Sequence, residues 1–223
     1  MKNILKIGSL MLFTSLLEAK EFSQDKSTKE YGVYFLIPEG EVKNKALDIS
    51  KRLGNDITPH ITVLQTVCNQ QTVLDIQREL NIWSESQRVF SIQFQDKIVG
   101  NDDGKTFWNI QDLKKLNEIN KDLSSKLENL RDGVSVQVKN KLHTFSNQEL
   151  IDYKKYGRQS YVPGNNNPHI TVSYTTDDKL FIDQISRELK NKIFKQEITE
   201  VSFGEIDDSG NIVKTISTYK LVK

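Results

Sequence analysis

A chain of 223 residues, with 36% hydrophobic residues and two tryptophans, is large enough to bury a packed core. This composition excludes wholesale disorder. The formal net charge of +1 argues against a protein that binds long duplex nucleic acid, since such a partner should produce a visible basic excess, whereas a small nucleotide or the end of an RNA strand is compatible with it.

The N-terminal segment has the pattern of a secretory signal peptide. Two lysines precede a mostly apolar stretch over residues 7–17, and Ala19 ends a candidate cleavage site. The stretch is too short to span a membrane. We therefore predict a signal peptide over residues 1–19, export to the periplasm or beyond, no stable membrane insertion after processing, and a flexible leader over 20–30. The alternative is an N-terminal amphipathic helix on a cytoplasmic protein.

Strands and helices alternate along the first half of the chain. Runs of branched and aromatic residues predict strands, and apolar residues spaced three and four apart predict helices. In chain order the predicted elements are a strand over 31–37, a helix over 41–53, a strand around 59–63, a helix around 73–80, and a hairpin with arms 89–99 and 105–110.

The second half begins with the helix that we predict to be the longest. A stripe of leucine and isoleucine follows one face of residues 112–131, and Gly133 stands where a C-terminal cap glycine belongs. Residues 146–149 (SNQE) have the form of a capping box. The elements predicted after the long helix are a strand over 134–138, a helix over 146–156, a strand around 168–172, a helix over 178–192, and a hairpin with arms 197–206 and 212–221.

One pentapeptide, PHITV, occurs at residues 59–63 and again at 168–172. Each copy has the composition of a strand, and side chains alternate between the two faces of a strand. His and Thr of each copy therefore share one face, while Ile and Val point the other way. Two such strands meeting across a cleft would surround one small polar group, for which a phosphodiester is the natural candidate. The four side chains are those of His60, Thr62, His169 and Thr171.

The elements around the two copies follow the same order, with a helix before each copy and a helix and hairpin after it. The hairpin glycines Gly104 and Gly210 follow His60 and His169 at nearly equal distances, which indicates a duplicated unit. We predict an α+β, bilobal duplicated fold in which two antiparallel β-sheets are flanked by helices around a central cleft. Residues 31–223 would form a single domain with interlocked lobes, each contributing one motif.

With two His-x-Thr motifs in matched contexts, the chain resembles the two-histidine (2H) phosphoesterase superfamily, which includes bacterial 2′-5′ RNA ligase-like proteins and cyclic phosphodiesterases. The proline before each motif, the leading strand and the hairpin after each motif also fit, so the resemblance covers about residues 31–221. It implies a bilobal α+β fold and metal-independent chemistry, without a cofactor, on 2′,3′-cyclic phosphates or on 2′-5′ and related phosphodiesters.

Acid–base chemistry suits the repeated residues independently of this resemblance. An unperturbed imidazole titrates near pH 6.5, so one of His60 and His169 can be neutral while the other is protonated. We expect one to act as base and the other as acid; the sequence does not say which. Thr62 and Thr171 would bind the non-bridging oxygens. One alternative is a polar strand face without catalysis. The other is a metal site, but two histidines without nearby carboxylates supply too few ligands, so we predict no metal.

Further candidates concern the rim of the site, the third histidine and the single cysteine. Residues 163–167 form either a rim over the substrate or a plain connector. His143 lacks a threonine two residues on and is assigned to the surface. The single cysteine, Cys68, excludes an intrachain disulfide; we interpret it as structural rather than nucleophilic.

Four aromatic residues are candidates for stacking on a base, with a core position as the alternative for those in strands. They are Tyr34, Phe35, Trp108 and Tyr161.

We therefore expect an exported, monomeric phosphoric diester hydrolase that acts on a nucleotide or an RNA end. The alternatives are RNA-end processing or 2′-5′ RNA ligase-type activity, and a catalytically inactive nucleotide-binding module. Turnover of 2′,3′-cyclic nucleotides, set against binding without turnover, discriminates an enzyme from a binding module.

Overall fold

A computed structural model describes residues 29–101, 104–132, 142–156, 167–174, 178–207 and 209–223. The predicted signal peptide, the predicted strand over 134–138, Gly133 and Tyr161 lie outside the described residues, as does nearly all of the predicted rim loop. None of the helices in these described ranges has the length and apolar character needed to cross a membrane.

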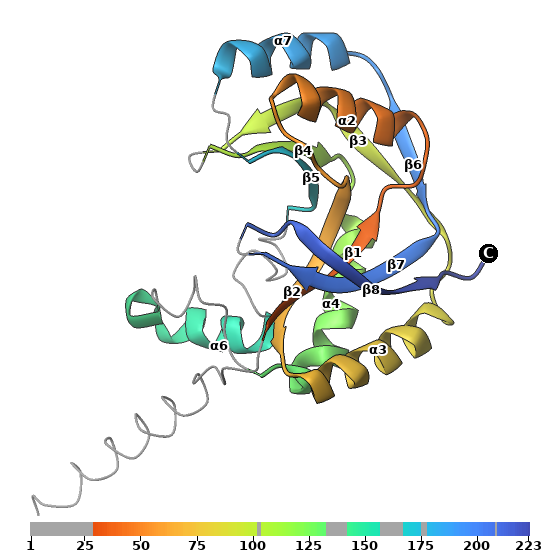
Figure 1. The fold of residues 1–223 in the computed structure, drawn as a ribbon, viewed down its shortest axis with the longest axis vertical. Helices are drawn as coiled ribbons and strands as arrows, with labels where there is room; N and C mark the ends of the chain where they lie inside the picture. Colours follow the sequence, from red (N-terminus) through yellow and green to blue (C-terminus); the bar gives the residue numbers. More distant parts are fainter. Residues whose placement is uncertain (1–28, 102–103, 133–141, 157–166, 175–177, 208) are drawn as a thin grey trace, which may run out of the picture.

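Two four-stranded antiparallel sheets form the centre of the molecule (Figure 1), which confirms the predicted α+β class with two sheets. The first sheet has the strand order β2-β1-β7-β8, and the second has the order β5-β4-β3-β6. The strands of the first sheet are β1 (Lys29–Leu36), β2 (His60–Cys68), β7 (Glu200–Ile206) and β8 (Ile212–Lys220). Those of the second are β3 (Phe90–Gly100), β4 (Thr106–Ile110), β5 (His169–Ser173) and β6 (Phe194–Ile198).

The hairpin that follows each motif strand belongs to the sheet of the other motif. Hairpin β3–β4 comes after β2 in the chain, but β4 pairs with β5. Hairpin β7–β8 comes after β5, but β7 pairs with β1, the neighbour of β2. Each sheet thus contains strands from both halves of the chain, so neither half completes its sheet alone. The two motif strands β2 and β5 also contact each other.

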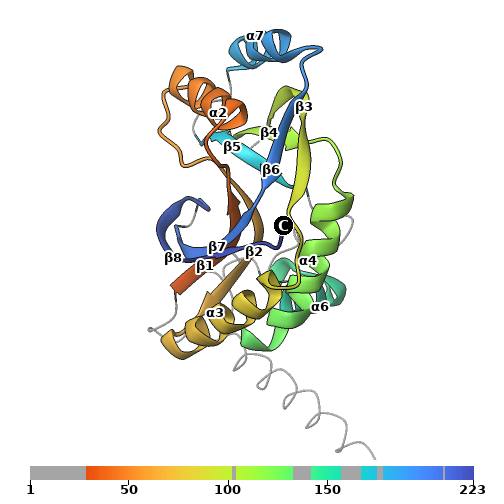
Figure 2. The same cartoon turned by 90° about the vertical axis from the view of Figure 1, so that its right-hand side faces the viewer.

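Each sheet is covered by its own pair of helices (Figure 2). Helix α2 (Glu41–Arg52) packs against β5 and β6, and α7 (Lys179–Leu189) packs against β3. Arg52 of α2 joins these two helices by donating to both carboxylate oxygens of Glu188, at 2.7 and 2.8 Å. Helices α3 (Gln70–Ser84) and α4 (Lys114–Leu127) pack against the first sheet, and α6 (Asn147–Tyr156) packs on α4. Helices thus flank both sheets, as predicted.

Several predicted boundaries need correction. The first strand begins before Tyr31, because Lys29 and Glu30 already pair with β2 and the Lys29 ammonium contacts Glu205 at 2.9 Å. The helix predicted over 112–131 is α4 followed by a short 3-10 turn, η1 (Glu128–Leu130), and α3 is one residue longer than α4. The capping box before α6 is confirmed: the backbone N–H of Ser146 donates to Glu149, and that of Glu149 donates to the Ser146 hydroxyl.

The predicted arm over 197–206 is in fact two strands. β6 ends at Ile198 in the second sheet, and β7 begins at Glu200 in the first. The chain therefore passes from one sheet to the other at Thr199. A hydrophobic pattern shows that both segments are extended, but it does not show which neighbour each one pairs with.

Candidate active site

The two motif strands have one buried face and one polar face, as strand alternation predicts. Burial in β5 alternates from His169 to Val172, with His169 and Thr171 partly exposed. In β2, His60 is 8% exposed and Thr62 is partly exposed. The residues on the opposite face are at most 3% exposed and belong to the core: Ile61, Val63, Ile170 and Val172.

Both motif histidines make the same hydrogen bond to the backbone two residues earlier. The Nδ1 atom of His60 lies 2.7 Å from the carbonyl oxygen of Thr58, and that of His169 lies 2.6 Å from the carbonyl oxygen of Asn167. A carbonyl oxygen only accepts, so the bonding pattern assigns the proton to Nδ1 in each ring. In the neutral form each Nε2 is then left with a lone pair that can take up a proton.

The two imidazoles are close enough to interact through their charges. Burial lowers the pKa of His60 below its usual value. Burial is also the main cause that lowers the pKa of His169 to about 4, and the charges on His60 and Lys105 lower it further. Both lowered pKa values favour the neutral ring at pH 7. An anionic phosphodiester bound between them would favour the imidazolium and raise both pKa values, as a general acid requires.

A β-bulge follows the threonine in each motif strand. In β2 the extra residue is Val63, because Thr62 and Leu64 pair with consecutive residues of β1. In β5 the extra residue is Val172, for the same reason in its pairing with β4. Bulges bend a strand and change the direction of neighbouring side chains. Their equivalent position in the two copies is a second sign of duplication.

An asparagine from a neighbouring element binds each strand at or just after its bulge. Asn120 of α4 is fully buried, and its amide donates to the carbonyl oxygen of Val63 at 2.8 Å. Asn55, in the loop after α2, donates to the hydroxyl of Ser173 at 3.0 Å and accepts from the backbone N–H of Tyr174 at 3.3 Å. These bonds tie each motif strand to a segment outside its own sheet.

The predicted base-stacking residues Tyr34, Phe35 and Trp108 are fully buried and form part of the core. The Tyr34 hydroxyl lies 2.9 Å from that of Thr215, and the Trp108 indole donates to the carbonyl oxygen of Gln95 at 2.7 Å. Because no ring face of these three residues is open to a base, their assignment to stacking is corrected. Tyr34 instead packs edge-on against His60, with ring centroids 5.7 Å apart.

A partly exposed aromatic ring lies against His169 of the second motif. It is that of Phe107, which was not among the residues predicted from the sequence. Its centroid lies 4.0 Å from that of His169, the rings are tilted by 37°, and Phe107 is partly exposed. Phe107 pairs with Thr171, and Asn109 pairs with His169. Alternation along β4 therefore places Phe107 on the polar face and Trp108 in the core. Once β4 is known to pair with β5, the sequence shows which residues of β4 lie on each face of the sheet.

Thr171 and Tyr174 form a second contact that the sequence did not predict. The Tyr174 side chain is hydrogen-bonded to that of Thr171, and burial raises the pKa of the phenol to about 12. Tyr174 is therefore neutral and can donate a proton in a hydrogen bond. A motif-based search stops at the fourth residue after the proline and so does not reach Tyr174.

Two other candidate functions have little structural basis. Burial raises the pKa of the Cys68 thiol to about 12, which favours a structural role over a nucleophilic one. Among the residues that the structure describes, no group of three or more His, Cys, Asp or Glu side chains is placed to hold a metal ion. His143, assigned to the surface, is exposed in η2 (Leu142–Thr144).

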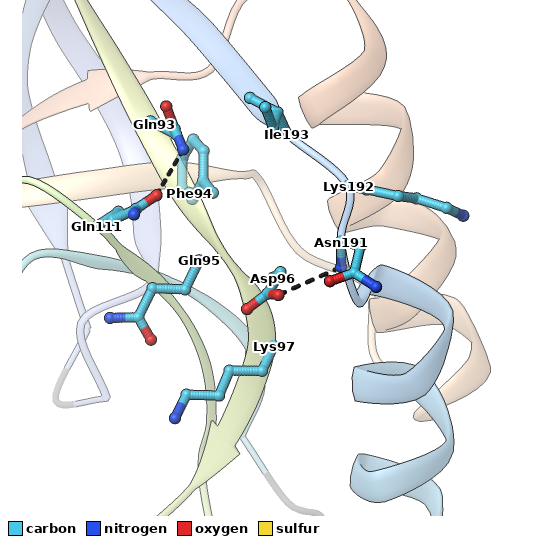
Figure 3. Close-up of a pocket in the computed structure, with 9 residues that line it drawn as sticks. All are labelled: Gln93, Phe94, Gln95, Asp96, Lys97, Gln111, Asn191, Lys192 and Ile193. Carbon is cyan, nitrogen blue, oxygen red and sulfur yellow. Dashed lines mark hydrogen bonds between the residues drawn. The ribbon is translucent and has the colours of Figure 1, made fainter.

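A cavity of about 440 Å³ lies between β3 and the segment that joins α7 to β6 (Figure 3). Most of the residues that line it are polar, among them Gln93, Gln95 and Asp96, and none of the motif residues is among them. The Asp96 carboxylate accepts from the backbone N–H of Asn191 at 3.3 Å, across the cavity wall. This cavity is separate from the histidine pair.

Comparison with known proteins identifies the fold. No family model matches the chain, and neither does any curated protein. The crystal structure of TT0787 of Thermus thermophilus is similar to this one over 86% of this chain and 97% of that chain, with 11% sequence identity and a TM-score of 0.52. The two proteins share a fold. In this chain the fold has two sheets, each with one His-x-Thr strand.

Two further solved structures show weaker similarity. A conserved protein of unknown function, ATU0111 from Agrobacterium tumefaciens, is 13% identical and has a TM-score of 0.44 over 86% of this chain and 88% of that chain. Usb1 of Kluyveromyces marxianus is 12% identical and has a TM-score of 0.42 over 87% of this chain and 98% of that chain.

Proposed function

We propose that this protein is a metal-independent phosphodiesterase of the 2H type, which cleaves 2′,3′-cyclic phosphate or 2′-5′ phosphodiester bonds of nucleotides or RNA ends. The observation that carries the proposal is the histidine pair. His60 and His169 lie on contacting strands, the charge on His60 acts on His169, and the two rings make matching Nδ1 hydrogen bonds.

In hydrolysis of a cyclic phosphate, the Nε2 of one histidine removes a proton from water as the water oxygen bonds to phosphorus. The bond from phosphorus to one ribose oxygen breaks, and that oxygen receives a proton from the other, protonated histidine. The base gains one proton and the acid loses one, so the net charge of the pair does not change. The starting protonation of each ring is restored when the rings exchange protons with solvent. Each such transfer typically contributes about 10²–10⁴-fold to the rate.

The two threonines would stabilise the charge that builds on the non-bridging oxygens. Thr62 and Thr171 are partly exposed on the same strand faces as the histidines, and each is followed by a bulge. Hydroxyl groups fixed by the strands need little reorganisation as the transition state forms. The hydrogen bond between Tyr174 and Thr171 further restricts the second hydroxyl.

A substrate panel tests the proposal. The purified protein is incubated in EDTA with the four 2′,3′-cyclic mononucleotides, 2′-5′ oligoadenylates and short RNAs with different 3′ ends, and products are separated by chromatography. We expect turnover of at least one phosphodiester at a rate that EDTA does not change. Binding without turnover across the panel would instead support a nucleotide-binding module, and cleavage confined to RNA ends would support RNA-end processing.

We also propose that the chain is exported, on the basis of the N-terminal sequence pattern alone. Cell fractionation with N-terminal sequencing of the mature protein tests this. A mature chain starting at residue 20 in the exported fraction is the expected result, and an intact N-terminus in the cytoplasm would contradict it.

A further inference from the structure

Lys105 is a basic side chain beside His169 that the repeated motif does not account for. It stands immediately before β4, and its charge is one of the causes that lower the pKa of His169. Its ammonium group donates to the carbonyl oxygen of Ser209 at 3.2 Å and lies 5.6 Å from the centroid of the Tyr174 ring. The cation thus lies beside the tyrosine that contacts Thr171 and close enough to His169 to act on its charge.

This position joins the two sheets at the histidine pair. Lys105 belongs to the β3–β4 hairpin of the second sheet, whereas Ser209 belongs to the β7–β8 hairpin of the first. The next residue, Gly210, makes a backbone hydrogen bond with His60. The β7–β8 turn therefore contacts Lys105 through one residue and His60 through the next, which places Lys105 at the site rather than on a remote surface.

None of the other described residues assigned to the proposed site brings a positive charge to it. Because the lowered pKa values favour neutral imidazoles at pH 7, the histidines bring no positive charge to an incoming anion. Thr62, Thr171 and the neutral Tyr174 donate hydrogen bonds but carry no charge. Within the described residues, Lys105 is in no ion pair with a carboxylate, and the backbone carbonyl that it contacts does not neutralise it.

We propose that Lys105 binds a non-bridging oxygen of the substrate phosphate on the His169 side of the site, exchanging its bond to the Ser209 carbonyl for one to the anion. This inference rests on the proposed function and adds a substrate-binding residue to it. Charged hydrogen bonds are roughly twice as strong as neutral ones, so Lys105 would select anionic phosphodiesters and offset charge in the transition state. The ammonium stays beside the Tyr174 ring in both positions, since a lysine stem is long and flexible.

The test compares Lys105→Met, which keeps the stem and removes the charge, with Lys105→Arg, which keeps a charge. Lys97→Met, in the separate cavity, is the matched control. Inorganic phosphate is the binding probe, titrated by NMR, and the chain's three histidines allow the ring signals to be assigned with single His→Asn variants. We expect Lys105→Met to weaken phosphate binding and to lower kcat/KM about tenfold or more, while Lys105→Arg retains most of both.

The NMR titration separates two effects: the pKa of His169 reports whether the Lys105 charge acts on that ring, and the phosphate affinity reports whether Lys105 binds the anion. Removing the positive charge should raise the pKa of His169 in Lys105→Met but not in Lys97→Met. Wild-type phosphate affinity and an unchanged His169 pKa in Lys105→Met, with a wild-type enzyme that is active, would overturn this inference and leave the proposed function intact. A wild-type protein that neither binds phosphate nor turns over any diester would overturn both.

Discussion

His60 and His169 make the same hydrogen bond, from Nδ1 to a carbonyl oxygen two residues earlier, at 2.7 and 2.6 Å. The carbonyls belong to Thr58 and Asn167, two different residue types that each stand two positions before the histidine in the chain. The strand backbone therefore orients both rings, whatever side chain stands at that position. Because each Nδ1 is held as a donor, the Nε2 atom of each neutral ring carries the lone pair that a base needs. The two rings differ in that His60 also makes a backbone hydrogen bond with Gly210.

The folded protein should lose stability in mild acid because His169 resists protonation. Its folded pKa is about 4, whereas an unfolded histidine titrates near 6.5, so the unfolded chain binds more protons between these values. The free energy of unfolding is then highest above pH 6.5. It falls by up to about 3 kcal/mol as the pH drops from 6.5 to 4. Urea denaturation from pH 7 to 4.5 measures this. His169→Asn should reduce the slope, and His60, whose pKa is also lowered by burial, should account for part of what remains. An unchanged slope in His169→Asn would contradict the account.

Removing either motif hydroxyl should slow the chemistry without unfolding the protein. Thr62→Val and Thr171→Val keep the shape of the side chain, and we expect each to lower kcat by about 10²-fold, as loss of one transition-state hydrogen-bond donor does elsewhere. Thr199→Val, at the passage between β6 and β7, serves as the control. Steady-state kinetics on the best substrate of the panel measures the effect. A wild-type kcat in both motif variants would remove the threonines from the mechanism.

Two neighbouring aromatic residues should respond in opposite ways. Phe107→Ala removes the ring that packs on His169 and should lower kcat/KM by about tenfold while costing little stability, because imprecise placement of a reacting group is expensive. Trp108→Ala should instead cost about 3–5 kcal/mol of unfolding free energy, because a fully buried side chain is lost. Kinetics and denaturant unfolding of both variants distinguish them. The reverse pattern would show that the two strand faces are assigned the wrong way round.

Asn120 should support the bulge beside Thr62. Asn120→Ala leaves the buried carbonyl of Val63 without its amide partner, which should cost about 1–3 kcal/mol and also lower kcat. Ser124 lies one turn further along α4 and is equally buried, but its hydroxyl finds no partner among the described residues. Ser124→Ala should therefore change stability little. Equal losses in the two variants would indicate general damage to the helix rather than loss of one hydrogen bond.

The sequence was sufficient to predict the faces of the motif strands and the described elements, apart from the break between β6 and β7, because these depend on local spacing. It was not sufficient to predict that each hairpin joins the other motif's sheet, since strand pairing is decided by long-range contacts that leave no local pattern. The same gap explains the mistaken choice of Trp108 over Phe107. A shift of one residue moves a side chain to the opposite face, and only the pairing of β4 with β5 fixes the phase.

Lys105 shows a different limit of sequence reasoning. It belongs to no motif and is one of many lysines and arginines in the chain. Its distinguishing property is its position between the two hairpins and beside His169. Tyr174 could have been suspected, because it follows the second motif by two residues, but its bond to Thr171 depends on the bulge at Val172 and on Asn55.

Hydrolysis of a 2′,3′-cyclic nucleotide in EDTA by the wild type, His60→Asn and His169→Asn tests the histidine pair most directly. Asparagine retains an N–H donor near the Nδ1 position but cannot transfer a proton at Nε2. We predict wild-type turnover and a loss of about 10²–10⁴-fold in each variant, with unfolding midpoints close to that of the wild type. Full activity in either variant, or wild-type turnover that EDTA abolishes, would contradict the proposed mechanism.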